Sequence, residues 1–182
     1  MSDENAKCVV LEVSYGEFDE VLGGDLTGTA GNGGDIESIV GPEVGPVEVY
    51  RSTITARAIP RTTTSLNATR PKIGVIQCGN GNSYGHPTAD ALGRLHAHGV
   101  RTYWNETGAG VAPDPAWDRV ANGAVTIQAT WAPGGVDTVR GLGFADTLTN
   151  SGVAADLVAP AVSVVTPNGG EVWLEGDTRV VR

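Results

Sequence analysis

The chain has 182 residues, of which 40% are apolar, and its formal net charge is −9. This acidic balance argues against a general nucleic-acid coat or a membrane-surface binder, because both need a basic face. The acidic balance does not exclude a nuclease, because the metal ions of a nuclease supply positive charge locally. No apolar run approaches the roughly 20 residues that cross a bilayer, and the opening residues lack a basic-then-apolar leader. We therefore expect no membrane segment and no signal peptide in this chain, and its localisation stays open.

The first predicted element is a β-hairpin. Residues 8–14 (CVVLEVS) are rich in β-branched side chains, and residues 18–22 return after a glycine turn, which is typical of two paired strands. The second strand leads to Asp25 on a Gly-Gly turn, a place where folds commonly expose functional groups. The local pattern by itself favours a plainer role, in which this carboxylate bonds to neighbouring backbone N–H groups.

Short elements follow the hairpin. Asp35 can cap a helix over residues 36–40 that Gly41-Pro42 would end, and residues 47–50 (VEVY) predict a further strand. The stretch over residues 51–70 contains no acidic residue and has no clean period. It predicts a solvated loop whose charge contrasts with the acidic remainder.

The central segment predicts a βαβ unit. Residues 72–79 are expected to form a buried strand and residues 80–86 a loop. A helix then begins at Pro87, ends near a left-handed Gly99, and is followed by a strand over residues 100–104. This order places two parallel strands beneath one helix. The predicted class is α/β with a mixed sheet.

The C-terminal third predicts less regular structure. Residues 125–131 (VTIQATW) are expected to form one more strand after a proline-rich loop. Residues 132–160 are predicted to be a Gly- and Asp-rich linker, and residues 161–182 begin a new unit. The first domain is therefore expected over residues 1–131.

Histidine and cysteine are scarce, which narrows the candidate chemistry. His96 and His98 lie two apart on a predicted helix, so they do not share a face and are expected at the surface. His86 ends a loop after a buried strand and precedes a helix, where it can serve as a helix cap, as a metal ligand or in catalysis. Cys8 and Cys78 lie inside apolar runs and are expected to be free core residues.

Two motifs occur in an order that a known family shares. The stretch CVVLEVSYGEFDEVLGGD is similar to a strand pair that ends in an aspartate, and PKIGVIQCGNGNSYGHP is similar to a strand, an Asn-Tyr loop and a histidine before proline. The helix and strand ADALGRLHAHGVRTYW follow as the family would have them. Residues 8 to about 104 thus resemble the second half of the metallo-β-lactamase fold, in the version found in ComEC-like competence proteins and their soluble relatives.

The resemblance implies a partial metallo-β-lactamase αββα sandwich and a hydrolase site that holds two zinc ions in intact members. Asp25 falls on the aspartate that bridges the metals, and His86 falls on the last histidine ligand. Asn82 and Tyr84 would line the site as substrate-binding residues. The substrates that the resemblance implies for an intact parent are phosphodiesters, nucleic acid among them.

Two departures from the family pattern weaken the expected metal site. The HxHxDH motif of the first half should precede residue 8 and is absent, and residues 51–61 stand where a His-His-Gly-Ser segment should follow VEVY. Codons for residues 52–61, read one base back, allow Val-His-His-His-Gly-Ser-Arg-Tyr-Ser-Ala, so a frameshift is one hypothesis for this stretch. A catalytic zinc needs about three protein ligands. With Asp25 and His86 alone, we expect weak zinc binding or none, and no activity from the isolated chain.

The C-terminal stretch VSVVTPNGGEVWLEGDTRVVR resembles the opening of an immunoglobulin-like or fibronectin-like module. Such a module needs about seven strands, so residues 161–182 are expected to be a truncated start, and an intact parent to be exported or on the cell surface. Two alternatives to a hydrolase fragment stay open: a non-catalytic secreted or surface binding module without metal ligands, and a degraded gene product. Because half a sandwich exposes one sheet face, poor solubility is expected.

Overall fold

A computed structural model of the chain describes residues 8–26, 28–29, 34–52, 62–131, 134–149 and 161–165. These residues form an α/β fold with a mixed sheet, as predicted. The helices are α1 (Glu37–Val44), α2 (Thr63–Thr69) and α3 (Ala89–Ala97). The strands are β1 (Val10–Tyr15), β2 (Phe18–Leu22), β3 (Gly28–Thr29), β4 (Gly34–Asp35), β5 (Val49–Ser52), β6 (Ile73–Ile76), β7 (Arg101–Trp104), β8 (Asp118–Val120), β9 (Thr126–Gln128), β10 (Val136–Gly141), β11 (Phe144–Thr149) and β12 (Ala161–Val165).

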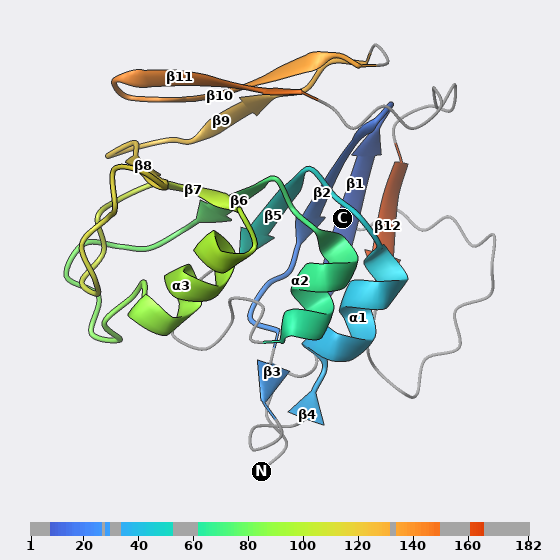
Figure 1. The fold of residues 1–182 in the computed structure, drawn as a ribbon, viewed down its shortest axis with the longest axis horizontal. Helices are drawn as coiled ribbons and strands as arrows, with labels where there is room; N and C mark the ends of the chain where they lie inside the picture. The colour runs from blue at the N-terminus through green and yellow to red at the C-terminus, as the bar shows by residue number, and fades with distance from the viewer. Residues whose placement is uncertain are drawn as a thin grey trace.

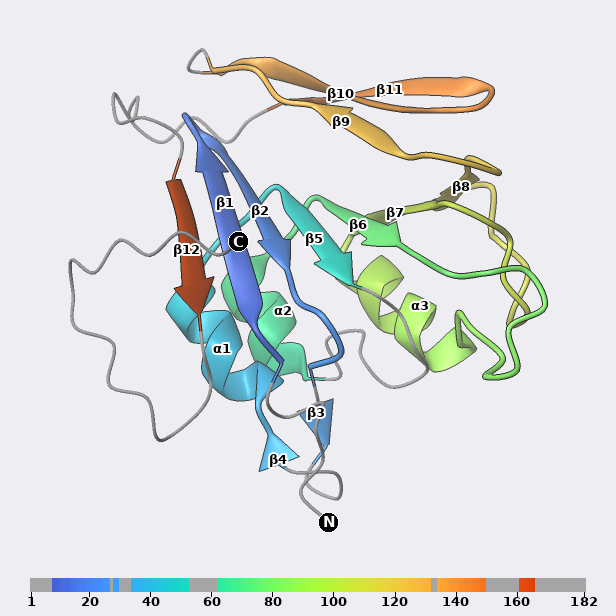
Figure 2. The same cartoon turned by 180° about the vertical axis from the view of Figure 1, so that it is seen from behind.

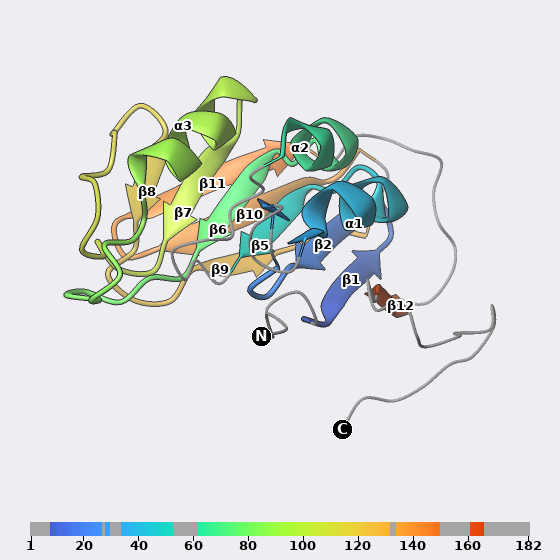
Figure 3. The same ribbon diagram turned by 90° about the horizontal axis from the view of Figure 1, so that it is seen from below.

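The main sheet has seven strands in the order β12-β1-β2-β5-β6-β7-β8 (Figure 1). Strands β2, β5, β6, β7 and β8 are parallel, whereas β1 is antiparallel to both β2 and β12. The predicted βαβ unit is confirmed as β6-α3-β7. Because successive parallel strands are added in one direction and such crossovers are right-handed, α1, α2 and α3 all lie on one face of the sheet (Figure 3).

Alternating side chains build a core on each face of this sheet. On the helix face, Val10, Val21 and Tyr50 pack against α1, and Ile76 and Trp104 pack against α3. These side chains are nearly completely removed from water, which is the main source of stability that burial supplies.

The opposite face is covered by a three-stranded sheet in the order β11-β10-β9. Phe18, Val49, Val75 and Tyr103 of the main sheet pack against Val139 of β10 and its neighbours. The small sheet lies by the end of the main sheet at which β2 and β5 begin (Figure 2). The carboxyl ends of β2 and β5 therefore point away from this cover.

The segment predicted as a linker over residues 132–160 differs most from expectation, because residues 136–149 form the β10–β11 hairpin. Its side chains alternate between more and less buried positions, and Gly143 supplies a positive φ of 85° at the tight turn. The pattern is hidden in the sequence because Asp and Thr occupy several strand positions. Residues 161–165 were expected to open a separate module, but they pair with β1 at the edge of the main sheet. Residues 166–182 lie outside the described part of the chain.

Two helices also differ from prediction. Helix α1 continues through an exposed Pro42 and ends at Gly45, whose φ is 76° and whose N–H donates to the Gly41 carbonyl. Helix α2 lies within the stretch that predicted a solvated loop. Thr62 caps it, because its hydroxyl accepts a hydrogen bond from the Ser65 N–H at 3.2 Å. Within the described ranges, no helix is long and apolar enough to cross a membrane.

Candidate functional site

The carboxyl ends of five parallel strands meet at one edge of the main sheet, the edge at which α/β folds commonly bind ligands. Asp25 follows β2 and His86 follows β6, with β5 between these two strands. The structure thus brings both predicted metal ligands to this edge, on loops from strands that are two spacings, roughly 10 Å, apart. The hypothetical frameshift segment follows β5, but residues 53–61 are outside the described part.

Asp25 lies on a tight glycine turn. Gly24 has a φ of 54°, and a side chain on Gly23 would lie 2.8 Å from the Tyr50 hydroxyl, so glycine is needed at both positions. Asp25 itself is half-buried. The turn therefore holds a carboxylate at the carboxyl edge, as the sequence predicts.

His86 is the most unusual residue at this edge, because it is only 2% exposed. Neither of its ring nitrogens, Nδ1 or Nε2, has a hydrogen-bond partner among the described residues. Burying polar atoms without partners is costly, and burial lowers the pKa of His86. The imidazole is therefore held in the neutral form, which is the form that ligates metal ions.

The two predicted substrate-binding residues have different surroundings. Tyr84 is 69% exposed, and its ring lies nearly parallel to the His86 ring, with 6.0 Å between centroids. The Asn82 side chain instead bonds to backbone: its carboxamide donates to the carbonyls of Gly79 and His86 and accepts from the His86 N–H. A role of either residue in substrate binding stays a prediction.

A second loop, which follows β7, closes over His86. The N–H groups of Ala109 and Gly110 donate to the His86 carbonyl at 2.8 and 3.0 Å. The Cys78 thiol beneath this loop contacts the Glu106 carbonyl at 3.1 Å, and burial raises its pKa. Cys78 is therefore a protonated core thiol, as predicted, whereas Cys8 is half-buried, and the two cysteines form no disulfide with each other.

A hollow of about 230 Å³ opens beside the Asp25 turn, on the sheet face opposite the helices. Arg51 brings a charge to it and also pairs with Glu20, with 2.7 Å between Nε and Oε1. The other side chains in it are mainly apolar, and Val9 is 55% exposed. The lining residues are Val9, Leu11, Leu22, Gly24, Arg51 and Gln77.

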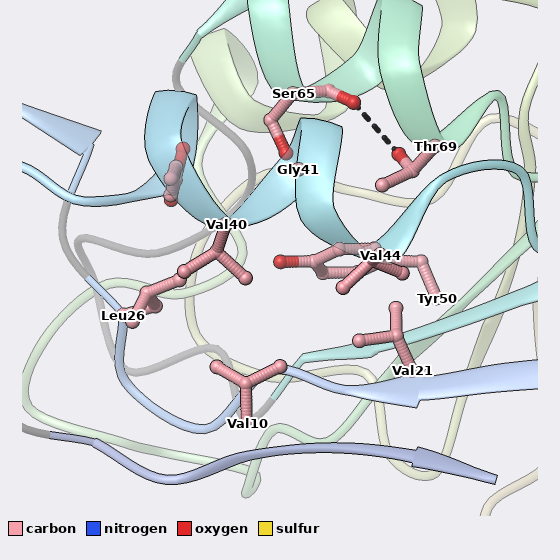
Figure 4. Close-up of a pocket in the computed structure, with 10 residues that line it drawn as sticks. Val10, Val21, Leu26, Val40, Gly41, Val44, Tyr50, Ser65 and Thr69 are labelled. Atoms are coloured by element: carbon pink, nitrogen blue, oxygen red, sulfur yellow. Dashed lines mark hydrogen bonds between the residues drawn. The ribbon is translucent and has the colours of Figure 1, made fainter. Parts of the chain in front are cut away.

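A smaller cavity of about 10 Å³ lies between α1, α2 and the sheet, among Val40, Tyr50 and Ser65 (Figure 4). Its volume suits about one water molecule. Burial and the nearby Glu37 carboxylate raise the pKa of Tyr50, so its hydroxyl stays protonated. This cavity belongs to the core and has no room for a substrate.

The other two histidines have different environments. His98 is exposed, as predicted. His96 was expected at the surface, but its Nε2 lies 2.9 Å from Oδ1 of the completely buried Asp118 carboxylate. Its ring also stacks on Trp117, with 5.3 Å between centroids. The expectation was wrong because Asp118 lies on β8, a strand that the sequence did not predict.

The described residues contain no group of three or more His, Cys, Asp or Glu side chains that could hold a metal ion. Comparison with protein-family models, with curated proteins and with solved structures finds no match for this chain. The likeness to the metallo-β-lactamase fold therefore rests on the two sequence motifs. The function of this chain is therefore inferred from the residues at the carboxyl edge of the main sheet.

Proposed function

We propose that this chain carries part of the metal site of a metallo-β-lactamase-fold hydrolase, in which His86 and Asp25 bind zinc. The observation that supports this proposal best is the buried His86 imidazole, whose two nitrogens have no hydrogen-bond partner among the described residues. A neutral buried imidazole of this kind suits a metal ion, which would take up one ring nitrogen. Asp25 adds an oxygen ligand from the neighbouring turn.

The expected substrate class is the phosphodiesters, nucleic acid among them, in an intact parent protein. Two zinc ions held by a full ligand set would supply an activated water and would offset the negative charge that develops on a phosphodiester. This chain supplies two of the needed ligands, so we expect it to bind zinc weakly and to show no turnover alone. The acidic net charge of −9 is compatible with such a substrate only where metal ions offset it.

A zinc titration followed by calorimetry tests the proposal. The full chain should bind zinc, and His86→Ala and Asp25→Asn should each weaken binding by tenfold or more. His98→Ala is the matched control, because it removes an exposed histidine that could bind zinc adventitiously. Equal affinity in wild type and His86→Ala would refute the proposed site. Turnover of a chromogenic phosphodiester well above the His86→Ala background would refute the prediction of inactivity.

The second candidate is a binding module without catalysis, which the likeness of the C-terminal stretch VSVVTPNGGEVWLEGDTRVVR to the opening of an immunoglobulin-like module favours. The zinc titration separates the two functions, since zinc binding that depends on His86 supports the hydrolase and no such binding supports the module. The nucleotide sequence from upstream of Met1 through the codons for residues 51–62 is a further test. An upstream HxHxDH and a shifted His-His-Gly-Ser frame would support a hydrolase whose reading frame is broken. A clean frame with nothing upstream would support the module.

A further inference from the structure

The backbone of His86 is held on both sides by one side chain. Asn82 Oδ1 accepts a hydrogen bond from the His86 N–H at 3.0 Å, and Asn82 Nδ2 donates to the His86 carbonyl at 3.0 Å. The same Nδ2 donates to the Gly79 carbonyl at 2.9 Å, which ties Asn82 to the segment after β6. A planar carboxamide bonded in this way fixes the orientation of both peptide groups of His86, and hence the direction in which its side chain leaves the backbone.

The loop after β7 also hydrogen-bonds to the backbone of His86 and of its neighbour Pro87. Two N–H groups of this loop, from Ala109 and Gly110, donate to the His86 carbonyl, and the Val111 N–H donates to the Pro87 carbonyl at 3.0 Å. A side chain on Gly110 would overlap the Pro87 carbonyl oxygen, so the loop can approach this closely only with glycine there. The His86 carbonyl thus accepts three hydrogen bonds in total.

The His86 ring, unlike its backbone, is not fixed by hydrogen bonds, because neither ring nitrogen has a partner among the described residues. Its place is therefore set by its backbone and by packing, including the near-parallel Tyr84 ring. We infer that Asn82 is a positioning residue, which orients the buried His86 imidazole so that its nitrogens stay available to a ligand. That the ligand is zinc rests on the proposed function; the placement of the ring does not.

The test compares Asn82→Ala with Ser83→Ala, an exposed neighbour on the same loop. Hydrogen exchange measures the His86 N–H, and nuclear Overhauser contacts measure the approach of the His86 and Tyr84 rings. In Asn82→Ala, exchange of this amide should rise at least tenfold and the ring contacts should be lost. Amides of β6 and β7 should keep wild-type exchange, which separates a local change from general loss of stability. Ser83→Ala should match wild type in both measurements.

Gly110→Ala provides a second route if Asn82→Ala folds poorly, because it pushes the second loop away without touching Asn82. Its control is Gly93→Ala, where an added methyl group meets nothing within 4 Å. The ring contacts should again be lost in Gly110→Ala and kept in Gly93→Ala.

Zinc affinity completes the test. We expect Asn82→Ala to bind zinc 10- to 100-fold more weakly than wild type, as is typical when an outer-shell partner is removed. Wild-type ring contacts in Asn82→Ala, or unchanged zinc affinity in a chain that needs His86 for zinc, would overturn the inference. If wild type and His86→Ala bind zinc alike, the proposed metal site fails, but loss of the ring contacts in Asn82→Ala would still support positioning.

Discussion

The buried carboxylate of Asp118 allows a quantitative test of the packing between α3 and β8. Its side chain is completely buried, and it accepts hydrogen bonds from His96 Nε2 at 2.9 Å, the Thr102 hydroxyl at 2.6 Å and the Asp114 N–H at 2.7 Å. When Asp118 is ionised, His96 Nε2 carries the proton of this hydrogen bond, because a carboxylate only accepts. Thr102 is itself fixed, since its hydroxyl accepts from the Trp104 indole N–H at 2.6 Å.

His96→Ala removes the donor that comes from α3 and leaves Asp118 with two neutral donors. Removing one donor from a buried carboxylate costs about 3 kcal/mol. The His96 side chain is 18% exposed, so water can reach part of the vacated space and the penalty is smaller. We expect His96→Ala to lower the free energy of unfolding by about 2–3 kcal/mol.

Urea denaturation at pH 7 measures this loss. The control Asp90→Asn breaks an ion pair on the same helix, between Arg94 and an aspartate that is 75% exposed, and should cost less than about 1 kcal/mol. In the double mutant with Asp118→Asn, the losses should fail to add by about 1–2 kcal/mol, because the two side chains share one interaction. A loss below about 0.5 kcal/mol for His96→Ala, or additive losses, would refute the reasoning.

Three further predictions concern pH, backbone freedom and association. Burial and the hydrogen bond to Asp146 raise the pKa of Tyr103 to about 12. The folded state therefore binds the phenol proton more tightly than the unfolded state, and the stability that this supplies is complete below about pH 10 and is lost as the pH rises to 12. The free energy of unfolding of wild type should fall by up to about 2.7 kcal/mol over that range. Tyr103→Phe should lose less in pH-dependent urea titrations, and the exposed Tyr84→Phe should behave as wild type. Gly93→Ala, at an exposed position of α3, should raise stability by about 0.5–1 kcal/mol, whereas Gly41→Ala should lower it, because the new methyl group would lie 2.7 Å from Ser65. The sheet face that was expected to be exposed is covered by β9–β11, so the apolar hollow around Val9 is the surface left for association. Sedimentation should show association of the chain, and a monomer that melts cooperatively would contradict this expectation.

The sequence predicted the centre of the main sheet well. The strand over residues 18–22 is confirmed to the residue, and the unit from β6 to β7 has the expected order and parallel pairing. These segments combine β-branched runs with clear glycine stops, such as Gly99 with its φ of 76°. In these segments the local sequence pattern favours the same structure as the tertiary packing, so the pattern alone is sufficient to predict them.

Elements with weak local preferences were missed. Helix α2 consists largely of Thr, Ser and Asn, which are poor helix formers, and it is stabilised by its Thr62 cap and by burial of Leu66. Strand β8 has three residues and depends on pairing with β7. The edge pairing of residues 161–165 with β1 joins segments about 150 positions apart, which no local pattern encodes.

The candidate site was predicted in part. The two motifs led to Asp25 and His86, and both lie at the same edge of the sheet. The hydrogen bonds between Asn82 and the His86 backbone were not predicted, because the Asn82 side chain was expected to line the substrate site. The sequence shows an Asn four residues before the histidine, but whether its side chain bonds to the His86 backbone depends on how the loop between them folds. Asp118 was missed for the same reason, since only its pairing with β7 brings it to His96.

The small sheet leaves part of the far face of the main sheet uncovered, next to the Asp25 turn, and this part is the surface through which the chain is expected to associate. Strands β9–β11 cover the far face near the start of the parallel strands, where Phe18 and Val49 are buried. The hollow beside Asp25 lies toward the other end of that face, where Val9 remains 55% exposed. If this hollow drives the association, Val9→Ser should raise the monomer fraction in sedimentation. The same substitution should leave zinc affinity unchanged, because Val9 is not one of the proposed ligands, and a change in zinc affinity would show that the hollow and the metal site are not separate.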